Sequence, residues 1–301
     1  MNYYSEIKEI LINNEINKKV KEYSKNKVEL ESYYNVGKLL IEAQGGEGKN
    51  TYGNELIKNY SIKLKTELNI NYNERTLRRM RQFYMTFKNW SAVPTELTIS
   101  HYTVLMTIKD IEKMKYYINV AKRDRIGYRQ LQDIIKNKEY ERLPESTKEK
   151  LKNNEELSLI EIIKDPILIK SNNLDINNIK EKTLQKLILD DLSSFLHQLG
   201  NGYAYIDNEY KIKIGNTYNY IDILLYNVIY HSYVVVELKV TPLKKEHIGQ
   251  IEIYMNYIDY NLKNINDNKT IGLIVTKENN EYIIKYSSDK RIKAIEYQLT
   301  Y

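Results

Sequence analysis

The segment YVVVELKV, residues 233–240, most constrains the fold of this chain. Its β-branched valines predict a buried strand, yet Glu237 and Lys239 interrupt the apolar run two residues apart. Side chains alternate between the two faces of a strand, so this acid and this base share one face and the flanking apolar residues point to the other. They either pair with each other or help to hold a metal ion and a water.

A second acidic residue lies in the preceding predicted strand, YNYIDILLYN, where Asp222 is flanked by isoleucines. If the two strands pair as neighbours, Asp222 meets Glu237 and Lys239 at one end of the sheet. Two carboxylates and an ammonium in a half-buried place are costly unless something compensates them. Mg²⁺ is a suitable compensator because it takes carboxylate oxygens and bridges to phosphate. Lys239 would orient or deprotonate the attacking water, with a lowered pKa. The alternative is an ordinary ion pair on an exposed sheet surface.

Length and composition limit the other classes of protein. A chain of 301 residues is long enough for two domains. The absence of cysteine excludes disulfides and thiolate metal sites, so any metal must be held mainly by oxygen ligands. No apolar run approaches the roughly 20 residues that span a membrane, and the charged start is unlike a signal peptide. We therefore expect a cytoplasmic protein without a membrane segment.

The first part of the chain, residues 1–165, is predicted to be helical, with apolar positions spaced by three and four. Residues 51–150 contain 20 Lys and Arg against 12 Asp and Glu, a balance of +8, whereas the other 201 residues sum to −2. A basic zone of this kind fits a polyanionic partner such as DNA. A solvated helix face is the other interpretation.

An arginine-rich helix is predicted to begin near Asn73, a suitable N-cap. Its apolar stripe is expected to consist of Leu77, Met80, Tyr84 and Phe87. Together with the preceding helix it has the outline of a helix-turn-helix. The candidate nucleic-acid-binding residues on it are Arg75, Arg78, Arg79 and Arg81.

The second part, residues 166–301, changes period after a polar, proline-marked stretch at 143–164. One helix is predicted over residues 181–200, EKTLQKLILDDLSSFLHQLG, with its end at Gly200. Short β-rich segments, a helix at 246–262 and further strands follow. This order predicts an α/β sandwich; its last strands are expected at 270–277, 281–288 and 295–301.

The helix at 246–262 carries Gln250, Tyr254 and Tyr257 on one face. Gly249 costs roughly 1 kcal/mol against alanine inside a helix, so it suggests that something approaches the backbone closely. Gln250 and Tyr254 would position a substrate phosphate or the lysine. The alternative is an ordinary amphipathic helix that covers the sheet.

These motifs, D-x14-E-x-K on consecutive strands followed by Q-x-x-x-Y on a helix, resemble the PD-(D/E)xK nuclease superfamily. The chain as a whole resembles the YhcG-type family through stretches between residues 33 and 277, among them RTLRRMRQFY, FLHQLGNGYAYI and HIGQIEIYMNYID. The resemblance implies an α+β protein: an all-helical N-terminal domain, then an α/β/α restriction-endonuclease-like domain with a mixed central sheet. It also implies roles in metal binding and catalysis for Asp222, Glu237, the Leu238 carbonyl, Lys239, Gln250 and Tyr254.

The chain departs from the family pattern at several positions. Ile221 stands where the motif has proline, and Leu184-Gln185 stands where the family shows a Leu-Glu pair. Glu181, one helical turn earlier, is the expected replacement for the missing acidic ligand. His197 is interpreted as a local substitution rather than a ligand.

The resemblance implies a Mg²⁺-dependent nuclease that cuts DNA, with Mn²⁺ as a substitute cofactor, in bacterial DNA processing or in defence against foreign DNA. One alternative is a nuclease fold that no longer cuts and serves as a DNA-binding or assembly protein. Another is RNA as the substrate. A double-strand break needs two active sites, so a homodimer is a further expectation.

Overall fold

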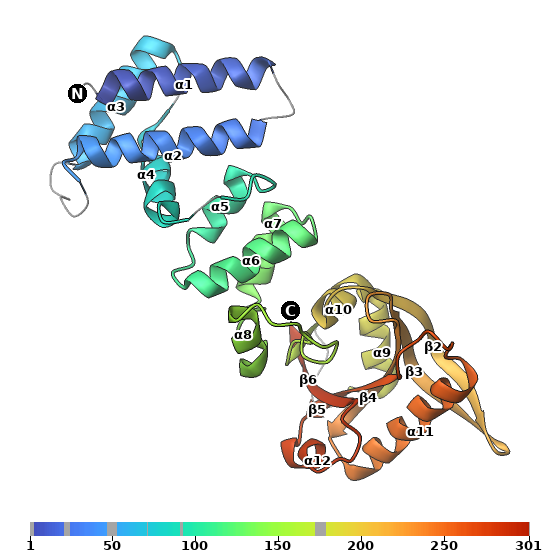
Figure 1. The fold of residues 1–301 in the computed structure, drawn as a ribbon. Coiled ribbons are helices and arrows are strands. Elements are labelled where there is room, and N and C mark those ends of the chain that lie inside the picture. Colours follow the sequence, from blue (N-terminus) through green and yellow to red (C-terminus); the bar gives the residue numbers. More distant parts are fainter. Residues whose placement is uncertain are drawn as a thin grey trace. The chain divides into compact units, whose positions relative to one another are not determined.

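The computed structural model describes residues 3–20, 25–46, 53–70, 72–90, 93–171 and 179–300. The chain folds as two compact units, Met1–Tyr140 and Glu141–Tyr301, and each is described by itself (Figure 1). Residues 141–165, which the sequence analysis grouped with the helical part, pack within the second unit. The DNA-binding and nuclease roles assigned to 1–165 and 166–301 stay predictions.

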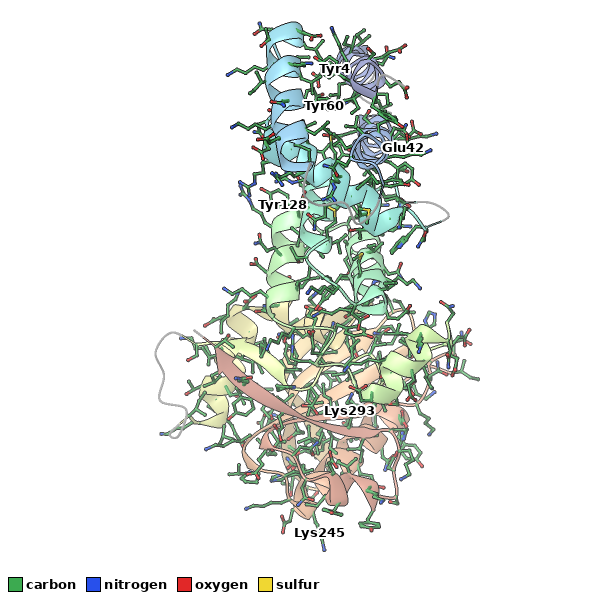
Figure 2. All side chains as sticks on the ribbon, turned by 90° about the vertical axis from the view of Figure 1, so that its left-hand side faces the viewer. Tyr4, Glu42, Tyr60, Tyr128, Lys245 and Lys293 are labelled. Atoms are coloured by element: carbon green, nitrogen blue, oxygen red, sulfur yellow. The ribbon has the colours of Figure 1, made fainter. Side chains whose placement is uncertain are left out.

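The described part of the first unit is helical, as expected. Its helices are α1 Tyr3–Val20, α2 Lys25–Ala43, α3 Gly53–Leu68, α4 Glu74–Phe87, α5 Ile99–Leu105, α6 Ile111–Arg123 and α7 Tyr128–Lys136. Figure 2 shows Tyr4 of α1 beside Tyr60 of α3, with ring centroids 5.3 Å apart. Helices α2 and α4 pack closely because Gly37 has no side chain: a Cβ there would lie 2.2 Å from the Met80 carbonyl oxygen.

The arginine-rich helix α4 begins as predicted. The Asn73 side chain accepts a hydrogen bond from the backbone N–H of Thr76 at 2.9 Å and so caps the helix. The predicted apolar stripe needs one correction, because Phe83 is buried together with Leu77, Met80 and Phe87, whereas Tyr84 is only half-buried. The buried face is therefore set by the i, i+3 spacing of Met80 and Phe83.

The second unit contains a six-stranded sheet and its covering helices. Its elements are α8 Glu145–Lys152, β1 Ile167–Lys170, α9 Glu181–Asp190, α10 Leu192–Leu199, β2 Tyr203–Ile214, β3 Thr217–Asn227, β4 Ser232–Pro242, α11 Lys245–Asn261, β5 Ile271–Glu278, α12 Glu281–Lys285 and β6 Ile292–Thr300.

The sheet is mixed, with the strand order β1-β6-β5-β4-β3-β2. Strands β2, β3 and β4 pair antiparallel, whereas β4, β5, β6 and β1 pair parallel. One face packs on α9 and α10 through Leu184, Phe195 and their neighbours, and the other packs on α11 through Ile251 and Met255. These three layers after a helical unit confirm the predicted α+β class with an α/β/α second half.

Two predicted elements of the second unit are wrong in detail. The segment 181–200 forms two helices rather than one, because the Asp191 side chain accepts from the Ser194 N–H and starts α10 anew. The segment EYIIKYSS forms the short helix α12 rather than a strand, with Asn280 capping it through the Ile283 N–H. Local capping decided both outcomes against the apolar pattern.

In the described part of the chain, no helix has the length and apolar character needed to cross a membrane.

Candidate active site

The candidate site lies where β3 and β4 part. The two strands pair as neighbours from Asn227 opposite Ser232 to Ile223 opposite Val236, and Asp222 follows directly. The Asp222 carboxylate accepts a hydrogen bond from the Leu238 backbone N–H at 2.7 Å. This bond fixes the acid of β3 against the next strand.

Glu237 and Lys239 lie on the side of β4 that carries α11, and Leu238 between them packs into the core on the other side. The Lys239 ammonium lies 3.2 Å from Glu237 Oε2 and 3.9 Å from a carboxylate oxygen of Glu181 on α9. The Glu237 residue is only 2 % exposed, and its Oε1 has no hydrogen-bond partner among the described residues. A buried oxygen without a partner is costly, and a cation would relieve that cost.

Both strand carboxyls bind a proton more tightly than usual. Burial raises the pKa of Glu237 to about 8, and the neighbouring Asp222 adds to the shift. Burial likewise raises the pKa of Asp222. Two carboxyls in this environment are difficult to ionise together unless positive charge enters the site.

The ammonium of Lys239 holds its proton more tightly than a free lysine does. Burial lowers its pKa, but the carboxylates of Glu237, Glu181 and Asp222 outweigh burial and hold the pKa above its usual value. Without a bound metal ion the side chain is therefore an ammonium, and the lowered pKa expected for this lysine beside a metal stays a prediction.

The site offers two carboxyl groups and a backbone carbonyl as possible ligands of a hard divalent cation. In the part of the chain that the structure describes, no group of three or more His, Cys, Asp or Glu side chains is arranged to hold a metal ion. Asp222 and Glu237 nevertheless supply two carboxylates, and the Leu238 carbonyl follows Glu237 on β4. Mg²⁺ is typically held by one or two carboxylates and keeps several waters, so these residues suffice for it.

Gln185, which stands where the family pattern has an acid, makes a hydrogen bond to the strand of Asp222. Gln185 on α9 is largely buried, and its side-chain amide donates to the backbone carbonyl of Asp222 at 2.8 Å. The carboxylate of Glu181, one turn earlier, is 45 % exposed and lies 3.9 Å from the Lys239 ammonium. Gln185 thus positions the strand that carries Asp222, whereas Glu181 brings the additional acid to the lysine.

Helix α11 brings its predicted residues beside this cluster. The Gln250 amide donates to the Tyr254 hydroxyl at 3.1 Å, and the electrostatic influence of Glu237 reaches the Tyr254 hydroxyl. Gly249 does not approach another part of the protein, because nothing lies within 4 Å of the position its Cβ would take. The close approach predicted at Gly249 is therefore not made by the described residues of this chain, and approach by a substrate stays a prediction.

His247 is a residue that the sequence analysis did not single out. Its Nδ1 accepts the backbone N–H of Lys244 at 3.2 Å, so a neutral ring carries its proton on Nε2. Burial lowers the pKa of His247, and the charge of Lys239 lowers it further. The signal in the sequence was the i, i+3 and i+7 spacing of His247, Gln250 and Tyr254 on one helix face.

The predicted nucleic-acid-binding arginines all lie in the first unit, on α4. Arg75 and Arg78 are exposed, and Arg78 is paired with Glu74 in the first turn. Arg79 is half-buried and contacts the hydroxyl of Tyr33. Arg81 is also half-buried, and its Nε is removed from solvent. The four arginines therefore do not form one uniformly exposed row.

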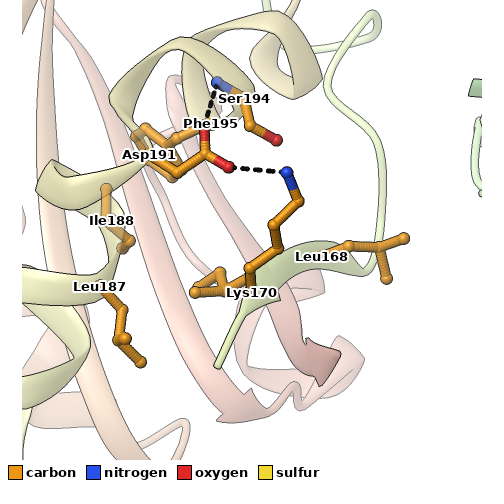
Figure 3. Close-up of a pocket in the computed structure, with 8 residues that line it drawn as sticks. Leu168, Lys170, Leu187, Ile188, Asp191, Ser194 and Phe195 are labelled. Atoms are coloured by element: carbon orange, nitrogen blue, oxygen red, sulfur yellow. Dashed lines mark hydrogen bonds and ion pairs between the residues drawn. The ribbon is translucent and has the colours of Figure 1, made fainter. Parts of the chain in front are cut away.

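A small cavity elsewhere in the second unit is lined mainly by apolar side chains and one ion pair. It has a volume of about 10 Å³ and lies between β1, α9 and α10 (Figure 3). Lys170 on β1 contacts Asp191 at 3.1 Å, and Asp191 also caps α10. The cavity has room for about one water, and its ion pair joins β1 to the break between the two helices.

Two family models match the chain. Residues 160–301 match the YhcG PDDEXK nuclease domain, and residues 6–142 match the DUF1016 N-terminal domain. The second unit is thus a nuclease domain of the PD-(D/E)xK class. With both domains in this order, the chain belongs to the YhcG-like family.

Individual relatives are distant. The chain is 24 % identical over 286 residues to "Putative nuclease YhcG" of Escherichia coli (strain K12), covering 82 % of this chain and 76 % of the relative. A crystal structure of a repair endonuclease from Pyrococcus abyssi is similar over 43 % of this chain and 49 % of its own, with 15 % identity and a TM-score of 0.30. The EndoMS-dsDNA2 complex is similar over 43 % of this chain and 46 % of its own, with 16 % identity and a TM-score of 0.28. The chain spans about half the length of these two structures.

Proposed function

We propose that this protein is a Mg²⁺-dependent nuclease that hydrolyses DNA phosphodiester bonds at the site formed by Asp222, Glu237 and Lys239. The observation that carries the proposal is the pair of carboxyl groups at the parting of β3 and β4, half-buried Asp222 and buried Glu237, in which Glu237 Oε1 has no hydrogen-bond partner among the described residues. A lysine two residues along the same strand contacts Glu237. This chemistry fits the nuclease domain of the family.

The residues that would hold Mg²⁺, or Mn²⁺ in its place, are Asp222, Glu237 and the Leu238 carbonyl. When bound, the ion lowers the pKa of a water and neutralises charge that develops on the phosphate. Asp222 is kept in place by the Leu238 N–H and by the contact of Gln185 with its carbonyl. Glu237 is kept in place by burial and by Lys239. Glu181 is the additional acid on the exposed side.

Lys239 acts as an ammonium in this scheme. It donates to the attacking water and to a phosphate oxygen, and so orients both groups for in-line attack. Gln250 and Tyr254 support this arrangement from α11, where their side chains are joined by a hydrogen bond. Removal of the lysine should therefore abolish cleavage and leave most of the binding.

The basic first unit would bind DNA phosphates, with Arg75 and Arg78 as the exposed arginines of α4 and with smaller contributions from Arg79 and Arg81. A homodimer would supply the two sites that a double-strand break needs. Cleavage of DNA in processing or in defence against foreign DNA is the biological role that family membership favours, in a cytoplasmic location.

A second candidate is a nuclease fold that binds nucleic acid without cutting it. The observation in its favour is Gln185, a neutral residue where the family pattern has an acid, which is engaged with the backbone of Asp222 rather than with a cation. A chain that binds DNA in saturating Mg²⁺ or Mn²⁺ but leaves it intact belongs to this class. RNA as substrate is tested by the same assay with an RNA of equal length.

The decisive experiment is cleavage of supercoiled plasmid in Mg²⁺, Mn²⁺ or EDTA. We expect metal-dependent nicking or linearisation by the parent and none by Lys239→Ala. The matched control is Lys170→Ala, which removes another strand lysine paired with a carboxylate, in this case Asp191. Equal cleavage by the parent and by Lys239→Ala would refute the assignment, and retardation of intact DNA by both would favour the second candidate.

A further inference from the structure

The hairpin of β2 and β3 extends beyond the rest of the sheet. Strand β3 pairs with β4 only as far as Ile223, whereas β2 and β3 stay paired from there to Ile214 opposite Thr217 (Figure 1). A two-residue turn closes the hairpin, and Gly215 supplies its positive φ of 59°. Residues 210–221 therefore form a two-stranded ribbon that starts directly next to Asp222.

The two faces of this ribbon differ sharply. One face packs into the core below α11, where Ile212 is 1 % exposed and Ile221 is fully buried. The other face carries two cross-strand pairs, Lys211 opposite Tyr220 and Lys213 opposite Tyr218.

The outward face consists of cations and rings that solvent reaches. Tyr218 and Tyr220 are each 52 % exposed, and Lys211 and Lys213 are exposed as well. The Lys211 ammonium lies 3.9 Å from the centroid of the Tyr218 ring. Exposed aromatic rings that share one face with ammonium groups are a feature of ligand-binding surfaces.

The charge of the ribbon is of one sign. Residues 210–221, YKIKIGNTYNYI, contain two lysines and no acidic residue. The nearest acid on β2, Glu209, lies within 3.6 Å of Lys182 on α9 and is thus partly neutralised. A polyanion with flat apolar groups is the chemistry that complements alternating ammonium groups and phenol rings.

We propose that this ribbon face binds an unpaired strand of the nucleic-acid substrate next to the scissile bond. Lys211 and Lys213 contact its phosphates, and Tyr218 and Tyr220 stack on its bases. The inference rests on the proposed function, because it places the ribbon along the path of the strand that is cut at Asp222. It assigns the nuclease to substrates with single-stranded segments, such as flaps, splayed ends or bubbles.

We infer an unpaired strand rather than a duplex because the rings of Tyr218 and Tyr220 are free to stack on bases. In a duplex the base faces are stacked on one another, so two exposed tyrosines gain little from it and only the lysines contribute. On a single strand every base offers a face, and loss of one aromatic platform costs about fivefold to 150-fold in affinity. The ribbon should therefore discriminate between the two forms.

The test is fluorescence anisotropy in EDTA with labelled oligothymidylate and with a blunt duplex of equal length. For Tyr218→Ala/Tyr220→Ala we expect at least about a 30-fold loss of affinity for the single strand and no change for the duplex. Tyr218→Phe/Tyr220→Phe keeps both rings and should bind like the parent. For Lys211→Gln/Lys213→Gln we expect the slope of log affinity against log salt to fall by about 1.4.

The matched control is Tyr260→Ala, which removes a tyrosine that is 89 % exposed in the last turn of α11. Equal losses on single strand and duplex, or no loss in the double alanine variant, would overturn the proposal. Circular dichroism of each variant checks that the hairpin still folds, and the phenylalanine pair provides a second comparison if the alanine pair does not. Because binding is measured in EDTA, its outcome is independent of whether the parent cleaves DNA.

Discussion

Divalent-cation binding at the candidate site should release protons, and the structure predicts how many. The pKa of Glu237 is about 8 because the carboxyl is buried beside Asp222. At pH 7 about ten molecules carry the proton for each one that lacks it, so binding of one Mg²⁺ should release about 0.9 proton. The apparent affinity for Mg²⁺ should rise about 50-fold from pH 6 to pH 8 and only about twofold above it.

Titration calorimetry in two buffers of different ionisation enthalpy measures both quantities without substrate. Glu237→Gln has no proton to release at this position, so its Mg²⁺ affinity should be low and nearly independent of pH. Without a cation, the raised pKa should make the parent less stable as pH rises from 4.5 to 8, because the unfolded chain gives up this proton first. A Mg²⁺ affinity that is constant from pH 6 to 9 would refute the assignment of Glu237 as a ligand.

Two further predictions concern Lys293 and Gln185. Burial lowers the pKa of Lys293 on β6 to about 8, while the unfolded chain holds that proton to about 10.5. The unfolding free energy of the parent should therefore rise relative to Lys293→Met by about 2.5 kcal/mol from pH 7 to pH 10, as measured by urea unfolding followed by circular dichroism; a constant difference would contradict it. Gln185→Ala leaves the Asp222 carbonyl without its donor and should cost about 1 to 3 kcal/mol in stability, together with reduced plasmid cleavage. An unchanged melting temperature would show that this hydrogen bond does not hold the strand.

Several features of the second unit followed from local pattern. The alternation in YVVVELKV placed Glu237 and Lys239 on one face and Leu238 on the other, and the structure has the same arrangement. The expected pairing of the two strands brought Asp222 beside them. These predictions succeeded because side-chain direction in a strand depends only on sequence position.

Other features of the site depend on neighbours that are distant in the sequence. The pKa of Lys239 is raised because three carboxylates from β3, β4 and α9 surround it, and their distances are not contained in any one segment. Gln185 has its partner 37 residues away, on the backbone of Asp222. The space beside Gly249 is open, so the close approach expected there does not come from the described residues of the chain.

The sequence by itself determined the two-part organisation, the strand faces and the three residues of the motif, because periodicity and spacing are local properties of the chain. Only the tertiary structure decided where β3 leaves β4. Beyond that point Asp222 is no longer paired with β4, and the Lys and Tyr face of the hairpin points outward. The physical cause of this outward direction is packing. Ile212 and Ile221 are buried under α11, so the residues that alternate with them must face the solvent.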